Sequence, residues 1–98
     1  MTKNSKSLTE KDIPIDNGTI DVLIEGHQAT IEIYWCTWSP RLKINFKDSN
    51  PKKGLPEEWA DYFEREGHQK IQSKYFLFEE PGILIFGKEE VRLKIVRA

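Results

Sequence analysis

Strict alternation of apolar and polar residues recurs along this 98-residue chain and constrains its fold more than any other feature. It appears in "TIDVLIE" (19–25), "ATIEIYW" (29–35) and "RLKINFK" (41–47), and again in "VRLKIVR" (91–97). Successive side chains of a β-strand point to opposite faces, so a period of two predicts strands that each turn one face toward a core. Only short stretches separate the first three segments, which indicates an antiparallel meander.

One segment follows the helical period instead. Leu55, Trp59, Tyr62 and Phe63 recur at the spacing of a single helix face. We therefore predict one α-helix over about residues 56–66, with a proline in its first turn and a glycine directly after its end. A helix of about three turns is not stable alone, so its apolar face must pack against the strands.

The last third of the chain returns to strands. "KYFLFEE" (74–80) and "ILIF" (83–86) flank a Pro-Gly pair, and a polar turn leads from there to residues 91–97. The resulting order is βββαβββ. We therefore predict an α+β domain, in which a curved, mainly antiparallel β-sheet of five or six strands packs with one α-helix.

Residues 1–17 are polar, mixed in charge and aperiodic. We interpret them as a flexible N-terminal tail, in which Ile13 and Ile15 are candidates for docking along a sheet edge. A single α+β domain then spans residues 18–98. The sequence contains no hydrophobic signal core and no apolar run of the roughly 20 residues that cross a membrane, so we expect a cytoplasmic protein without membrane contact. A single cysteine agrees with a reducing compartment.

The apolar residues exceed what one helix can cover. In "YWCTW" (34–38) and "YFLFEEPGILIF" (75–86), they occupy successive positions and so lie on both faces of a strand. Either the sheet closes around its own core, or its uncovered face meets another molecule, which includes a second copy of the chain. We expect Trp35 and Cys36 to be interior. Trp38 is expected either to pack over the end of the core or to contact a partner.

Few residues offer catalytic or metal-binding chemistry. A nucleophilic Cys36 requires a base, and the spacing of His27 and His68 brings neither histidine to the cysteine. The same three residues lack the close spacing that is typical of zinc ligands. A small enzyme built on Cys36 is therefore only the third hypothesis, and we predict no catalytic residue, no metal and no cofactor.

The aromatic and basic residues around the predicted hairpin favour binding. Tyrosine, tryptophan and arginine are preferred anchors of protein interfaces, and Tyr34, Trp38 and Arg41 lie close together in the sequence. We predict a non-enzymatic protein-binding module, such as a small inhibitor, immunity or accessory protein, that occludes the surface of a partner. The acidic residues of the helix would steer the encounter.

The alternative is a module that binds single-stranded nucleic acid. It would use a basic strand face with aromatic stacking, formed if the strands 41–47 and 91–97 lie near one another. Its candidate residues are Arg41, Lys43, Lys47, Arg92 and Lys94. The net charge of -1 provides no overall attraction to nucleic acid, so another protein is the first choice of partner, with a homodimer also open.

Overall fold

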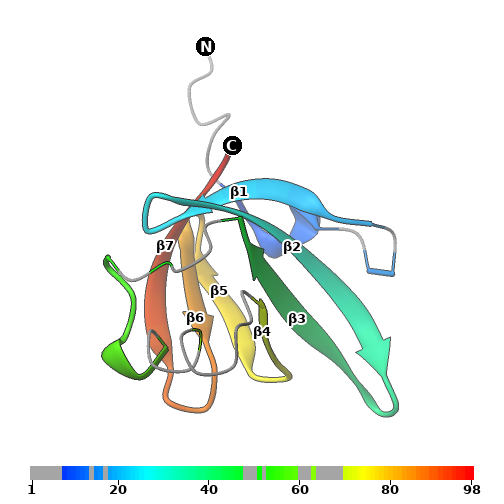
Figure 1. Cartoon of the computed structure of the whole chain (residues 1–98). Helices are drawn as coiled ribbons and strands as arrows, with labels where there is room; N and C mark the ends of the chain where they lie inside the picture. Colours follow the sequence, from blue (N-terminus) through cyan, green and yellow to red (C-terminus); the bar gives the residue numbers. More distant parts are fainter. Residues whose placement is uncertain are drawn as a thin grey trace.

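The computed structural model describes residues 8–13, 15–16, 18–47, 51, 53–59, 63 and 70–98. Strands make up most of its regular structure (Figure 1). They are β1 (Ile20–Ile24), β2 (His27–Cys36), β3 (Ser39–Phe46), β4 (Lys70–Ser73), β5 (Phe76–Glu80), β6 (Ile83–Phe86) and β7 (Val91–Arg97). A short 3₁₀ turn, η2 (Glu10–Asp12), precedes them.

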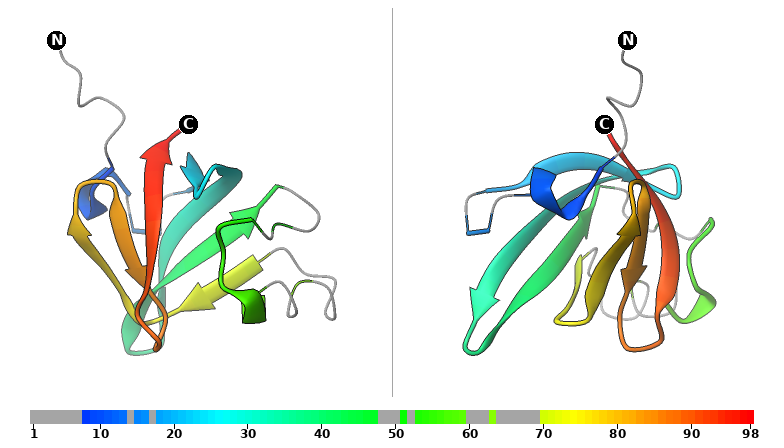
Figure 2. Two further views of the ribbon diagram at one scale, coloured as in Figure 1. Left: turned by 90° about the vertical axis from the view of Figure 1, so that its left-hand side faces the viewer. Right: turned by 180° about the vertical axis from the view of Figure 1, so that it is seen from behind.

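The strands form one open, seven-stranded sheet in the order β4-β3-β2-β1-β7-β6-β5. Every neighbouring pair in this order is antiparallel. The pairing of β1 with β7 joins the first four strands to the last three, and the sheet curves strongly between these two groups (Figure 2). β4 and β5 follow one another in the chain but stand at opposite ends of the sheet, so it does not close into a barrel.

The mostly antiparallel sheet and the short helix agree with the predicted α+β class, but the predicted strand number of five or six and the predicted order βββαβββ are wrong, since four strands follow the helical segment. The additional strand is β4, which lies between the helical residues and β5. Its four residues, "KIQS", include a single apolar side chain, Ile71. One apolar position cannot produce a visible period of two, so the strand gave no signal in the sequence.

Alternate residues of the strands form the core, as the period of two predicts. No polar or charged side chain in the described part of the chain is buried with them. Because these side chains are entirely apolar, they require no hydrogen bonds of their own and are stabilised by removal of their surface from water. The buried strand residues are Val22, Ile24, Ala29, Ile31, Ile33, Leu42, Ile44, Phe46, Leu84, Phe86, Leu93 and Ile95.

The helical segment packs against both groups of strands. Residues 57–59 and Phe63 are helical, and the rest of the predicted helix lies outside the described residues. Trp59 is 8% exposed, and its ring meets the ring of Phe86 in β6 edge to face, with 5.7 Å between the centroids. The buried ring of Phe63 meets Phe46 of β3 in the same manner at 5.6 Å. Of the four residues predicted for the apolar face, Trp59 and Phe63 are buried, Leu55 is half-buried, and Tyr62 lies outside the described residues.

The N-terminal strap, defined as residues 8–13 and 15–16, packs against the same core. Leu8 and Ile13 are buried, at 0% and 3% exposure. The N–H of Gly82, in the turn between β5 and β6, donates a hydrogen bond to the carbonyl oxygen of Leu8 at 3.0 Å. The strap thus begins beside the C-terminal group of strands and belongs to the folded domain.

The strap ends along the edge of β2, in the other group of strands. Ile15 forms a parallel bridge with Ile33, and the N–H of Asp16 donates to the carbonyl oxygen of Ile33 at 2.7 Å. The predicted flexible tail over residues 1–17 is therefore wrong for the strap, whereas docking of Ile15 at a sheet edge is confirmed. The apolar residues of the strap are scattered among polar neighbours and show no periodicity, so its packing against the core could not be predicted from the sequence. Residues 1–7 lie outside the described residues.

Within the chain, the outer face of the β5–β6 hairpin is only partly covered, so cover of residues 75–86 by another molecule, one of the two expected arrangements, stays a prediction. Phe76 and Phe78 are half-buried and pack against the core. On the opposite face of β5, the side chain of Leu77 is 56% exposed. Curvature therefore hides the inner face of this hairpin and leaves an apolar residue of its outer face in water.

Candidate interaction surface

The β2–β3 hairpin extends beyond the rest of the sheet (Figure 1). β1 pairs with β2 only as far as Ile31, and β4 pairs with β3 only from Leu42 onward. Residues 34–41, which we call the hairpin tip, therefore form a two-stranded ribbon in which Tyr34 lies opposite Arg41. The ribbon extends beyond β1 because β2 has ten residues and β1 has only five.

Trp38 occupies the turn of the hairpin tip, and its side chain is 89% exposed. The preceding residue, Thr37, has a φ of 61°, a conformation that β-branched residues rarely adopt. Positive φ is what a two-residue connection between antiparallel strands requires, so the tight turn forces this conformation on Thr37. Of the two expectations for Trp38, packing over the core is excluded and exposure is observed.

Trp35 is 55% exposed, so the prediction that it is interior is wrong. It lies on the same face of β2 as the buried Ile33, but two residues closer to the end of the hairpin. The core ends at Ile33, and the alternation of the strand continues past it. Cys36, also expected to be interior, is only half-buried.

Tyr34 projects from the opposite face of β2 and is held in place by two neighbours. Its hydroxyl hydrogen-bonds to Oε1 of Gln72 in β4. The Nζ atom of Lys43 in β3 lies 5.4 Å from the centroid of the Tyr34 ring, within the range of a cation–π interaction. The ring is therefore oriented before any partner arrives.

Arg41 carries the formal charge of the hairpin tip and is half-buried. Its Nε atom is buried without a hydrogen-bond partner, and no carboxylate in the described part of the chain forms an ion pair with it. A guanidinium group binds carboxylates through two parallel hydrogen bonds. The tip thus combines exposed indole rings with a cation that is not neutralised within the described domain.

The N-terminal strap also contributes to the tip. The backbone N–H of Trp35 donates to Oδ1 of Asp16 at 3.1 Å, and the neighbouring Ile15 is 47% exposed. Sequence reasoning placed Ile15 at a sheet edge but did not connect it with the aromatic cluster. Because the two segments are nearly 20 positions apart, no local pattern joins them.

The five basic residues of the nucleic-acid hypothesis do not form one face. β3 and β7 are separated by β2 and β1, so Arg41, Lys43 and Lys47 are remote from Arg92 and Lys94 in the strand order. Three of the five cations also have acidic partners. These pairs are Lys43 with Glu32 at 3.7 Å, Lys47 with Asp21 at 3.5 Å, and Arg92 with Glu79.

Cys36 and His27 are at opposite ends of β2. They are nine positions apart along an extended strand, which corresponds to about 30 Å. The His27 ring instead contacts Phe46, and its Nε2 lies 2.6 Å from the carbonyl oxygen of Lys53. The pair required by the third hypothesis is thus not assembled, and His68 lies outside the described residues.

Among the described residues, no group of three or more histidine, cysteine, aspartate or glutamate side chains could hold a metal ion. No helix in that part of the chain is long and apolar enough to span a membrane. Comparisons with protein families, with curated proteins and with solved structures gave no match.

Proposed function

We propose that this protein is a non-enzymatic binding module that attaches to another protein through its hairpin tip. The observation that carries the proposal is the 89% exposure of Trp38 at the end of a paired hairpin. Buried tryptophan is among the strongest contributors to protein interfaces, and truncation of such a residue commonly costs 2 kcal/mol or more. At this exposure, Trp38 contributes little to the packing of the domain itself.

The neighbours of Trp38 provide the surroundings of an interface anchor. Trp35 adds a second exposed indole, Tyr34 is already oriented by Gln72, and Arg41 offers a cation to a carboxylate of the partner. Side chains that are ordered before binding lose less conformational entropy on binding. The tip therefore fits an apolar pocket that carries an acidic group at its rim.

The role that follows is occlusion of the partner's surface, as in small inhibitors, immunity proteins and accessory proteins. Glu57 and Glu58 of the helical segment are exposed and would steer approach to a basic surface, and the remaining helix acids lie outside the described residues. A cytoplasmic location is part of this proposal, since the chain has a single cysteine and forms no internal disulfide.

The test is a parallel capture experiment from an extract of the native host, using the wild type, Trp38→Ala and Glu89→Ala. Glu89 is exposed in the turn between β6 and β7, so its variant is the matched surface control. We expect a protein captured by the wild type and by Glu89→Ala to bind Trp38→Ala at least about thirtyfold more weakly, which corresponds to about 2 kcal/mol. Equal binding to all three proteins would exclude the hairpin tip as the contact.

Binding of single-stranded nucleic acid is the second candidate function, supported by the exposed indoles beside Arg41. Surface ion pairs such as Lys43–Glu32 contribute little energy, so their cations could exchange partners. This function predicts a steep loss of oligonucleotide affinity as salt increases. Fluorescence anisotropy with a labelled oligothymidylate at low salt measures it directly, and absence of binding there removes this candidate.

A further inference from the structure

β5 is an edge strand whose free side has no backbone partner among the described residues. Unpaired N–H and C=O groups at a sheet edge are a template for another strand. Natural proteins usually protect such edges with charges or cover them. Here the centre of the strand is "FLF", residues 76–78, and Leu77 is 56% exposed.

The hydrogen-bond pattern identifies which groups are free. The N–H of Gly87 donates to the carbonyl oxygen of Tyr75 at 2.8 Å, so these two residues form a hydrogen-bonded pair of the β5–β6 ladder. Hydrogen-bonded and non-hydrogen-bonded pairs alternate along an antiparallel ladder. Leu77 therefore bonds toward β6, whereas the N–H and C=O groups of Phe76 and Phe78 point to the free edge.

We propose that this edge pairs with the same edge of a second copy of the chain, antiparallel and related by a two-fold axis through Leu77. In that register, Phe76 lies opposite Phe78 of the second copy, and Phe78 lies opposite its Phe76. Each such pair exchanges two hydrogen bonds, so all free backbone groups of these residues are satisfied. The two Leu77 side chains meet on the axis in a non-hydrogen-bonded pair, where side chains are closest.

The charges at the two ends of the strand also favour the antiparallel arrangement. Lys74 stands before β5, and Glu80 is its last residue; both are exposed. Antiparallel pairing about Leu77 brings the basic end of each strand to the acidic end of the other. If the partner strand were shifted by two residues, Phe76 would lie opposite Glu80 instead of Phe78. The apolar pairs and the charged pairs therefore favour the same alignment.

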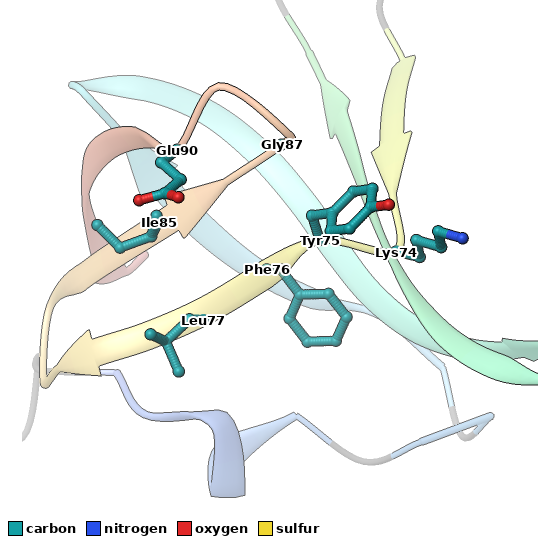
Figure 3. Close-up of a pocket in the computed structure, with 7 residues that line it drawn as sticks. All are labelled: Lys74, Tyr75, Phe76, Leu77, Ile85, Gly87 and Glu90. Carbon is teal, nitrogen blue, oxygen red and sulfur yellow. The ribbon is translucent and has the colours of Figure 1, made fainter.

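The outer face of the β5–β6 hairpin is open next to Leu77. A shallow groove of about 390 Å³ runs along the start of β5 and is lined by Tyr75, Leu77 and Ile85, with Lys74 and Glu90 at its rim (Figure 3). At the other end of β5, a register irregularity between Phe78 and Glu80 ends the regular ladder. The pairing is therefore confined to a short segment, and we infer a weak dimer that forms with increasing protein concentration.

The first experiment is sedimentation equilibrium of the full chain from about 1 µM to about 1 mM, the range of weak to moderate dissociation constants. We expect wild type and Trp38→Ala to form dimers equally, because this contact does not involve the hairpin tip. Leu77→Lys is expected to weaken the dimer at least tenfold by placing two ammonium groups together on the axis. Lys74→Glu should also weaken it, and Lys74→Glu combined with Glu80→Lys should restore it.

A second measurement tests the axis itself. Cα atoms of a non-hydrogen-bonded antiparallel pair lie about 4.5 Å apart, within the range that a disulfide bridges. Leu77→Cys in a Cys36→Ser background should therefore form a covalent dimer on mild oxidation, whereas Glu89→Cys in the same background should not. A wild type that stays monomeric up to about 1 mM, or a dimer that is insensitive to Leu77→Lys, would overturn the proposal.

Discussion

Trp59 and Trp38 are the same side chain in two equally aromatic stretches, yet Trp59 is 8% exposed and Trp38 is 89% exposed. Trp59 lies between the two groups of strands, where the rings of β6 and β3 contact the helical segment on both sides. Trp38 lies at the end of a two-stranded ribbon that extends beyond the paired part of β1. The difference teaches that aromatic density alone does not distinguish a core from a contact surface in this chain.

The largest expected effect is the loss of stability when Trp59, the buried tryptophan, is replaced. Trp59→Ala removes a ring that packs against Phe86, and such substitutions cost about 3–5 kcal/mol of unfolding free energy. Trp38→Ala is the matched control and should change stability by less than about 0.5 kcal/mol, because an exposed side chain has few contacts to lose. Urea unfolding followed by circular dichroism measures both. Equal losses in the two variants would contradict the comparison.

A second substitution asks whether the strap is part of the core or merely rests on it. Leu8 is fully buried, so Leu8→Ala should cost about 2 kcal/mol or more, whereas Leu77→Ala at an exposed leucine should cost much less. Since the strap also holds the hairpin tip through Asp16, the amide of Trp35 should exchange with solvent faster in Leu8→Ala. Hydrogen exchange that is unchanged at Trp35 would show that the strap and the tip are independent.

The smallest expected effect concerns the charge that fastens the strap. A hydrogen bond from the backbone N–H of Thr9 (3.0 Å) and the guanidinium of Arg97 (3.1 Å) lower the pKa of Asp12 below its ordinary value. A lowered pKa in the folded state means that the carboxylate stabilises the fold above the unfolded pKa of about 3.9 and loses this contribution as the pH falls further.

Thermal unfolding of wild type and Asp12→Asn between about pH 7 and pH 2 checks this expectation. The wild type should be slightly more stable at neutral pH, and the two melting temperatures should converge in acid, because an amide neither titrates nor attracts Arg97. The difference between the two proteins isolates Asp12 from the other carboxylates. A difference that does not change with pH would mean that the charge of Asp12 plays no part in holding the strap.

Much of the candidate site followed from local sequence. Tyr34 and Arg41 face each other across the ribbon because the Thr37–Trp38 turn fixes their register, whereas the sequence indicated only that they lie close together in the chain. The exposure of Trp35 was not readable, because it depends on where the neighbouring strands end. The proximity of Asp16 to Trp35 and the distance between β3 and β7 are likewise products of long-range pairing.

By itself, the sequence determined the strands other than β4 and the apolar face of those that alternate, because side-chain alternation is a local property of extended backbone. The tertiary structure alone decided how far each strand is covered, which scattered residues of the N-terminal segment enter the core, and which edge remains unpaired. These outcomes depend on burial against segments distant in the chain. Burial is therefore what separates Trp59, which holds the fold together, from Trp38 and Leu77, which are left to meet other molecules.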